Sequence, residues 1–333
     1  MTDFTLKKRQ DWTKSETTRV NKFIMDKSTN GEFIHAPFFL EYHPKNRFTD
    51  DSVAIFDLNC GTVAGVMMAA VDPNNKRCVI SHPGTTFAGP VVKNGATISL
   101  KERIISMLLN YYESIYSKIC IKTVPEIYTT QCCGEISYFL LKRGYNIGMT
   151  ALANVANISK YHSEDEVFEL YKAKRRNQIR KAIVLNNFKL ESNKTIRKDV
   201  WDHMTDNLCK KFHSRPTHSY SEICSLVERC PEYIKAYYAN SKDGDYGAFA
   251  LIFQFKNVFH TQYLDTNYAY AGQYPNLFLI HHLFLEAIKT GCTFFSFGSS
   301  TENGGNYLNQ GLHNYKAEYG GGSIILPIYQ KDL

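Results

Sequence analysis

IKAYYANSKDGDYGAFALIFQFKNVFHTQYLDT, residues 234–266, is the stretch that decides the fold of this chain. Apolar and polar side chains alternate along its three parts, which is the pattern of β-strands with one buried face. Residues 242–244 (Lys-Asp-Gly) and 256–257 (Lys-Asn) interrupt the alternation with residue types that favour tight turns. The stretch therefore predicts three antiparallel strands joined as a meander.

A helix, a strand, a second helix and a second strand are expected after the meander, and the same order is expected in the first half of the chain. In the second half, these elements are predicted at residues 275–291, 293–300, 306–321 and 323–329. In the first half, a hairpin at 53–72 precedes elements at 100–118, 122–130, 134–145 and 149–159. Either the architecture is duplicated, or the order recurs by chance. We favour duplication and predict an α/β (α+β) fold with lobes at residues 1–159 and 160–333, the second beginning with a basic helical segment.

The composition excludes several classes of protein. Of the 333 residues, 44% are hydrophobic and 21% are charged, which is typical of globular chains with a large core. The nine cysteines include no C-x-x-C pair, so we expect neither a zinc ribbon nor a disulfide framework, but reduced thiols in the cytoplasm. No apolar run matches a signal peptide or a membrane span, although the protein could still work at a membrane surface. The net charge of +7 suits anionic ligands, and without a groove-reading motif we expect no DNA partner.

A basic cluster occupies residues 172–181, which contain six lysines and arginines and no acidic residue. Arg176 and Arg180 are four residues apart, so on a helix they share a face that Lys172 extends. Such a face can hold a phosphate or a pyrophosphate through charge-assisted hydrogen bonds. It can equally be a solvated helix surface, and the pattern alone leaves both interpretations open.

The last strand of the meander, NVFHTQYLDT (257–266), carries polar side chains beside an apolar row. Alternation places His260 and Gln262 on one face and Tyr263 on the other. Such a polar pair is either a hydrogen-bonded structural pair or the floor of a site.

The segment FSFGSSTENGGNYLNQGLHNYKAEYGGG (295–322) begins as a strand and continues as a polar loop and a helix. Gly298 and Gly304 do not have the spacing of a P-loop, which excludes that motif. Loops after the carboxyl end of a strand are where open α/β sheets bind ligands, and helix N-termini can hold anions. A turn without function has the same composition.

Elsewhere His282 and Glu286 share a helix face, but a third ligand is not evident, so we expect no metal.

Several segments together resemble FemAB-type members of the GNAT acyltransferase superfamily, in a branch found among polysaccharide-biosynthesis proteins. KAKRRNQIRKAIVLNNFKLE (172–191) resembles the family pattern S-x-R-R-x-x-I-R-K-A-x-x-x-G. FFSFGSSTENGGNYLNQGLHNYKAEYGG (294–321) resembles D-F-G-x-S…L-N-x-G-L-x-x-x-K-x-x-F-G-G. Further blocks are similar and occur in the family's order: FIHAPFFLEYHPKNRFTDDS (33–52), SHPGTTFAGPVV (81–92), RPTHSYSEI (215–223) and NVFHTQYL (257–264).

The resemblance implies two tandem GNAT-like lobes, each a mixed, largely antiparallel sheet flanked by helices. It implies transfer of an acyl or aminoacyl group to an amine, from acyl-CoA or from aminoacyl-tRNA. Lys316 aligns with the tail lysine of the family, and Arg175, Arg176 and Arg180 align with its basic helix.

The segments depart from the family pattern in three ways. Ser296 stands where an Asp is usual, Asn186 and Asn187 replace a glycine, and Tyr319 replaces a Phe. Neither lobe contains the Q/R-x-x-G-x-G/A pyrophosphate loop of ordinary acetyltransferases, which leaves the donor open.

The leading hypothesis is an N-acyltransferase that forms an amide on an amino sugar or a nucleotide-linked precursor of a cell-surface polysaccharide, with acyl-CoA as co-substrate. Glu302 or His260 would act as the base, and Lys316 with the arginine face would hold phosphates. The residues expected to contact substrate are Gln262, Tyr263, Ser299, Asn309, His218 and His82. One alternative is an aminoacyl-tRNA-dependent transferase that acts on a peptidoglycan precursor. Another is a non-catalytic module of the same fold that binds a sugar nucleotide.

Overall fold

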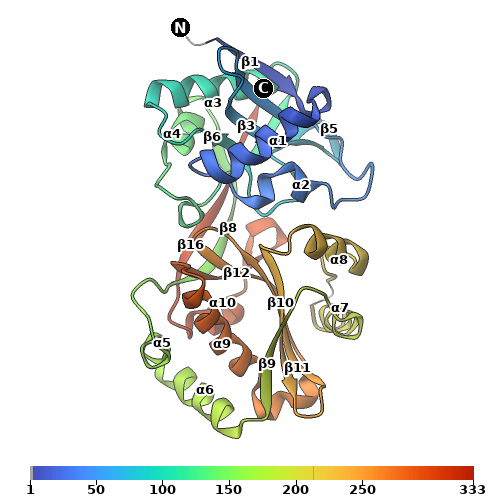
Figure 1. Ribbon diagram of the computed structural model, residues 1–333, viewed down its shortest axis with the longest axis vertical. Coiled ribbons are helices and arrows are strands. Elements are labelled where there is room, and N and C mark those ends of the chain that lie inside the picture. Colours follow the sequence, from blue (N-terminus) through green and yellow to red (C-terminus); the bar gives the residue numbers. More distant parts are fainter. Residues whose placement is uncertain (1–2, 213) are drawn as a thin grey trace. The chain divides into compact units, whose positions relative to one another are not determined.

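The computed structural model describes residues 3–212 and 214–333, which fold into two units (Figure 1). The first unit contains Met1–Ala151, Asn303–Tyr307 and Ile325–Leu333, and the second contains Leu152–Glu302 and Leu308–Ile324. Strands β8 (Asn146–Asn157) and β16 (Gly322–Asp332) each contribute residues to both units. The division into lobes at residues 1–159 and 160–333 stays a prediction.

In the first unit, two groups of strands are combined with helices. The antiparallel strands β1 (Phe4–Lys8), β2 (Val53–Asp57), β3 (Val63–Met68) and β6 (Gly89–Val92) pair in the order β1-β2-β3-β6. The strands β4 (Ala70–Asp72), β5 (Asn75–Ile80), β7 (Lys118–Lys122) and β16 pair in the order β4-β5-β7-β16, and β5 is parallel to β7. The helices are α1 (Lys14–Lys22), α2 (Pro37–Leu40), α3 (Ile98–Glu113) and α4 (Glu135–Lys142), with 3-10 turns at Arg9–Asp11, Phe33–His35 and Glu126–Tyr128 and a π-helical turn, η2 (Phe23–Lys27), directly after α1.

The predicted hairpin is confirmed by β2 and β3, which are antiparallel neighbours. Gly61 lies in the connecting turn with φ +66°, a conformation that costs a glycine little and most other residues more.

The strand predicted at 122–130 is wrong, because the strand β7 lies earlier. Ile119 and Ile121 alternate with more exposed residues along β7 and are buried. Pro125 has no N–H group for a strand ladder, and a 3-10 turn follows it. The helix predicted at 100–118 therefore ends at Glu113.

The second unit is a mixed sheet with helices on both faces (Figure 1). Its strands pair in the order β8-β13-β12-β11-β10-β9, where β9 is Phe188–Asn193, β10 Ile234–Ser241, β11 Tyr246–Gln254, β12 Val258–Thr266 and β13 Phe294–Ser299. Its helices are α5 (Glu164–Leu170), α6 (Ala173–Leu185), α7 (Lys198–Phe212), α8 (Tyr220–Arg229), α9 (Pro275–Lys289) and α10 (Gln310–Ala317), with a 3-10 helix at Tyr268–Gln273. Short pieces at Thr301–Glu302, Asn303–Gly305 and Tyr307–Leu308 connect β13 to α10. The predicted meander and the predicted fold class are both confirmed.

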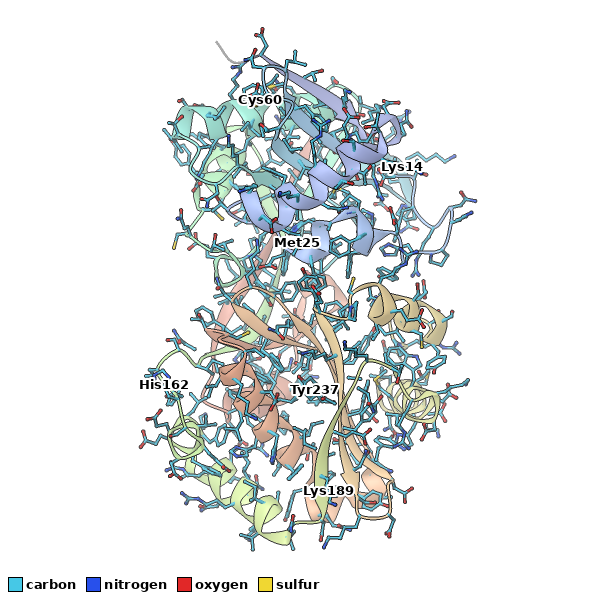
Figure 2. The ribbon with its side chains drawn as sticks, in the orientation of Figure 1. Lys14, Met25, Cys60, His162, Lys189 and Tyr237 are labelled. Carbon is cyan, nitrogen blue, oxygen red and sulfur yellow. The ribbon has the colours of Figure 1, made fainter. Side chains whose placement is uncertain are left out.

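The core of the second unit lies between the sheet and α9. Phe284 of α9 stacks on Phe295 of β13 with ring centroids 4.1 Å apart, and Phe259 of β12 joins them. Tyr237 of β10 belongs to the same buried cluster (Figure 2). Each large side chain buried in this way contributes about 1.5–3 kcal/mol, so this layer holds β12 and β13 rigidly.

A bulge in β12 changes the predicted faces of that strand. His260 pairs with Phe253 and Tyr263 pairs with Leu251, so one extra residue lies between them on β12. Phe253 and Leu251 share a face of β11, and His260 and Tyr263 therefore share a face of β12. The prediction that Tyr263 points away from His260 is wrong, because it assumed an uninterrupted period of two.

Candidate active site

The parallel strands β12 and β13 separate inside the second unit. Their ladder covers three residue pairs and ends at His260 and Ser296, whereas β12 continues to Thr266 beside β11. Gly298 has φ +68° and turns β13 away. Beyond this point the backbone of β12 no longer has β13 as its ladder partner, which is where open α/β sheets commonly bind ligands.

His260 lies at this parting and is held as a neutral imidazole. It is 7% exposed, and its Nδ1 is 3.0 Å from the Oγ of Ser296. Burial lowers the pKa of His260 to about 4, the positive charge of Lys316 acts in the same direction, and a hydrogen bond with Gln262 opposes them. The imidazole is therefore uncharged at neutral pH.

Lys316 reaches the same place from α10. Its Nζ donates to the carbonyl oxygen of Ser299 at 2.6 Å and to that of Gly298 at 3.3 Å. The residue is 8% exposed, and burial lowers the pKa of its ammonium to about 8. A neutral amine retains two N–H bonds for these carbonyls and has a lone pair that can accept a proton.

The loop between β13 and α10 forms an exposed rim. Asn309 caps α10 by accepting a hydrogen bond from the N–H of Leu312 at 2.9 Å, and its Nδ2 donates to Glu302 at 2.8 Å. The hydroxyl of Ser299 lies 2.7 Å from that of Thr301. Of the two predicted bases, Glu302 thus lies on the exposed rim, and His260 is buried where the strands part.

Asn154 is a residue of this site that the sequence did not reveal. It is fully buried on β8, and its Oδ1 accepts a hydrogen bond from the hydroxyl of Ser300 at 2.8 Å. The contact anchors the loop directly after β13. Nothing in the local sequence predicts it, because the two residues are 146 positions apart.

Tyr263 and His218 form a pair on the same face of the sheet as His260. The Tyr263 hydroxyl lies 2.7 Å from the Nδ1 of His218, and its ring packs edge-on against Trp201 of α7. Burial raises the pKa of Tyr263 to about 12, so its hydroxyl stays protonated.

Arg175, from the predicted phosphate-binding face, points into the second unit. It is 8% exposed, forms an ion pair with Glu318 and lies 4.7 and 5.0 Å from the ring centroids of Tyr315 and Tyr319. Its charge is thus engaged within the protein.

The other two arginines of this face lie closer to solvent. Arg176 donates to the carbonyl of Tyr171 at 3.4 Å, and Arg180 lies over the ring of Phe168. A cavity of about 320 Å³ is lined by Arg180 and Lys181, by Val184 and Leu185, and by Tyr274, which immediately precedes α9. The accessible lining of the cavity itself is apolar, so Arg180 and Lys181 line it with their aliphatic stems, and only their charged ends could contact a phosphate group.

His82 belongs to the first unit. Its φ of +61° is rare for histidine, and its ring packs against His43 and Phe48. Burial and the neighbouring charge of His43 hold the pKa of His82 well below its usual range.

Two further findings concern the described residues, 3–212 and 214–333. No group of three or more His, Cys, Asp and Glu side chains there is placed to hold a metal ion. No helix in this part of the chain has the length and apolar character needed to cross a membrane.

A family model described as "Acetyltransferase (GNAT) domain" matches residues 172–317. The match includes the separating strands, His260 and Lys316. The match covers less than half of the chain and supports an acyltransferase. No curated protein matches the sequence.

Solved structures extend this likeness over the whole chain. FemX has a TM-score of 0.67 at 11% identity, covering 95% of this chain and 96% of that chain. The C-terminal domain of a putative lysylphosphatidylglycerol synthetase from Agrobacterium fabrum has a TM-score of 0.57 at 12% identity, covering 94% of this chain and 90% of that chain. A tandem GNAT protein from the clavulanic acid biosynthesis pathway has a TM-score of 0.51 at 9% identity, covering 99% of this chain and 98% of that chain. At these identities the likeness shows the fold, and the GNAT-like fold that the sequence resemblance implied is confirmed.

Proposed function

We propose that this protein is an N-acyltransferase whose reacting groups lie in the second unit. The observation that carries the proposal is the buried pair of Lys316 and His260 at the point where β12 and β13 separate. This pair combines a base of suitable pKa with freed backbone groups beside it. Both are needed to form an amide from an activated acyl group and an amine.

Lys316 is the base in this proposal. An acceptor amine attacks as a neutral group, and α-amines have a pKa of about 7.7–8.0. A base works best with a pKa close to the working pH, and the pKa of Lys316, about 8, meets that condition. As the amine nitrogen forms its bond to the acyl carbon, its proton passes to the Nζ of Lys316, directly or through one water molecule. The bond between the acyl carbon and the donor's leaving group then breaks; with a thioester donor, the sulfur leaves as a thiolate that takes up a proton.

In this proposal, His260 orients the substrate, and the backbone of β12 stabilises the charge that develops on the acyl oxygen. With a pKa of about 4, His260 is too weak a base to hold the proton at neutral pH, but its neutral ring can hydrogen-bond to substrate together with Gln262. A backbone N–H of β12 beyond the end of the ladder would stabilise the negative charge that develops on the acyl oxygen. Tyr263, His218, Ser299 and Asn309 are the proposed substrate contacts around this centre.

We propose acyl-CoA as the donor. The family that matches residues 172–317 is described as an acetyltransferase domain, and such domains generally use acyl-CoA. The cavity at the start of α9 offers Arg180 and Lys181 for the donor's phosphates. The bound thioester would supply the activated acyl carbon, while this chain supplies the orientation and the base.

The proposed acceptor is an amino sugar or a nucleotide-linked precursor of a cell-surface polysaccharide. Its support is the resemblance of the sequence segments to the polysaccharide-biosynthesis branch. We place the reaction in the cytoplasm, where acyl-CoA is available, and all nine cysteines are free thiols, as a reducing compartment requires.

A second candidate is transfer from an aminoacyl-tRNA. Its support is that FemX and the lysylphosphatidylglycerol synthetase domain share the fold at higher TM-scores than the tandem GNAT protein does. The exposed lysines of α6, Lys172 at its N-cap and Lys174 and Lys181 within it, could contact tRNA phosphates.

The experiment is a thiol-release assay with a panel of acyl-CoAs and amino-sugar nucleotides, run with the wild type and Lys316→Met. Release that depends on acceptor and falls by two orders of magnitude or more in the variant supports the proposal. If product forms from charged tRNA without thiol release, the result supports the second candidate, transfer from an aminoacyl-tRNA, instead of acyl-CoA. A folded protein that turns over neither donor, or equal rates in both proteins, refutes the proposed catalytic role.

A further inference from the structure

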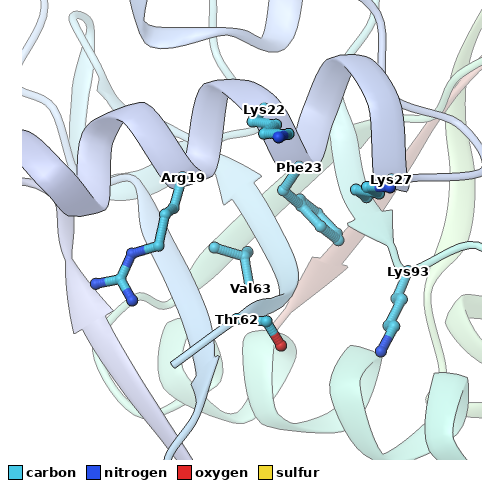
Figure 3. Close-up of a pocket in the computed structure, with 7 residues that line it drawn as sticks. All are labelled: Arg19, Lys22, Phe23, Lys27, Thr62, Val63 and Lys93. Atoms are coloured by element: carbon cyan, nitrogen blue, oxygen red, sulfur yellow. The ribbon is translucent and has the colours of Figure 1, made fainter. Parts of the chain in front are cut away.

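A cavity of about 330 Å³ in the first unit has basic walls and an apolar floor (Figure 3). Its walls carry Arg19, Lys22, Lys27 and Lys93, and its floor contains Phe23 and Val63. Among residues 3–212 and 214–333, no acidic side chain lines it. The cavity lies at the small end of the range of ligand pockets, about 300–1,000 Å³.

Backbone hydrogen bonds hold the basic segments next to one another. The N–H of Asn94 donates to the carbonyl of Lys27 at 2.9 Å, and the N–H of Lys93 donates to that of Ala64 at 3.1 Å. An isolated bridge also pairs Ser28 with Lys93. Lys27 and Lys93 are therefore brought together by the fold itself, and their proximity does not depend on mobile side chains.

The π-helical turn η2 places two of the lysines on the same wall. Lys22 and Lys27 are five residues apart, a spacing that puts side chains on different faces of an α-helix. A π-turn closes its hydrogen bonds over five residues, so residue i+5 comes round near residue i. Such turns are rare and frequently occur at functional sites, which is a second reason to assign a ligand to this cavity.

In the part of the chain that the structure describes, no carboxylate pairs with Lys22, Lys27 or Lys93. Glu16 lies 3.9 Å from Arg19 but is held by Lys7 at 2.7 Å. Like charges gathered in this way repel one another, and a bound anion relieves the repulsion.

We infer that this cavity is a second binding site, separate from the proposed active site, for a ligand with a phosphate or diphosphate group. The phosphate lies against the lysines, which donate charge-assisted hydrogen bonds, and the carbon skeleton lies on Phe23 and Val63. A free phosphorylated metabolite and the headgroup of an anionic phospholipid both present this chemistry.

The test measures binding to the full-length protein with two probes. Pyrophosphate and UDP are titrated calorimetrically at 50 and 200 mM salt, and phosphatidylglycerol vesicles are tested by co-sedimentation. The variants are the double substitution Lys27→Met/Lys93→Met and, as a matched control, Lys14→Met, which removes an exposed lysine of α1 that does not line the cavity (Figure 2). Arg180→Met/Lys181→Met removes the phosphate site proposed in the second unit.

We expect saturable binding that weakens at higher salt and falls at least tenfold in Lys27→Met/Lys93→Met, but not in Lys14→Met or Arg180→Met/Lys181→Met. If the soluble probes bind in this way, the ligand is a free phosphate compound. If only vesicles do, it is a lipid headgroup. No binding of any probe to the wild type, or an equal loss in the double variant and Lys14→Met, overturns the inference. Unchanged circular dichroism of the variants establishes that they are folded.

Discussion

Replacing Lys316 by methionine should make the difference in stability between wild type and variant depend on pH. Burial lowers the pKa of Lys316 from its ordinary 10.5 to about 8, so between these values the unfolded chain keeps a proton that the folded chain has released. The free energy of unfolding contributed by Lys316 therefore rises with pH through this window. One pKa unit corresponds to about 1.4 kcal/mol, so the whole effect is about 3 kcal/mol, of which about 2 kcal/mol develops between pH 7 and 9.5.

The two proteins are compared by urea denaturation at pH 7, 8, 9 and 9.5. Methionine leaves the carbonyls of Gly298 and Ser299 without their donor, which lowers stability by about 1–3 kcal/mol at every pH. The slope against pH is thus the informative quantity, and the wild type should gain about 2 kcal/mol on the variant by pH 9.5. His260 does not interfere, because its pKa of about 4 lies outside the window. Lys174→Met, at an exposed position of α6, should show no slope. A constant difference for Lys316→Met would mean that Lys316 titrates normally, and the case for it as base would be lost.

Four further predictions follow from the same contacts. In the proposed reaction, kcat should rise with pH, reach half of its maximum near pH 8 and a plateau about one pH unit higher, and lose this dependence in Lys316→Met, as measured by thiol release. Gly298→Ala should lower the free energy of unfolding, measured by urea titration, by about 1–2 kcal/mol, because φ is +68° and the new Cβ would lie 3.4 Å from Cε1 of His260. The control Gly272→Ala, at a position with open space around it, should change the free energy of unfolding by less than about 1 kcal/mol. Ser296→Asp should raise the pKa of His260 by about 1–3 in an NMR titration, whereas Ser296→Asn should not, because only Asp places a negative charge 3 Å from the ring. Arg175→Met should destabilise by about 2–4 kcal/mol in thermal or urea unfolding, since it leaves Glu318 unpaired, and Lys174→Met by less than about 0.5 kcal/mol.

The sequence predicted the meander of the second unit, for reasons that are local, and it pointed to two residues of the proposed site. Strand alternation and turn residues are encoded within a few positions, so the meander and His260 on its last strand were accessible. Lys316 was accessible because a family pattern aligned it. The bulge in β12 could not be predicted from the sequence, because one inserted residue breaks the period of two that the strand otherwise maintains.

Contacts between distant segments were inaccessible for a different reason. Glu318 neutralises Arg175 across 143 residues, and Asn154 anchors Ser300 across 146. The basic cluster, interpreted as either a phosphate-binding face or a solvated helix surface, therefore gave no sign that one of its arginines, Arg175, is turned inward. The strand predicted at 122–130 failed because Pro125 follows the strand that does form and no pattern separated α3 from β7.

The replacement of the family's Asp by Ser296 bears directly on which residue acts as the base. A carboxylate 3 Å from the imidazole would favour the charged ring and raise the pKa of His260 towards neutrality, where a histidine can accept a proton. A serine hydroxyl supplies a hydrogen bond without a charge, so burial and the charge of Lys316 together hold the ring neutral. The same burial lowers the pKa of Lys316 into the working range. In the proposed mechanism, the serine thus leaves His260 a weak base and Lys316 as the group that takes the proton. On that proposal, the departure from the pattern that the sequence resembles is compatible with a retained activity.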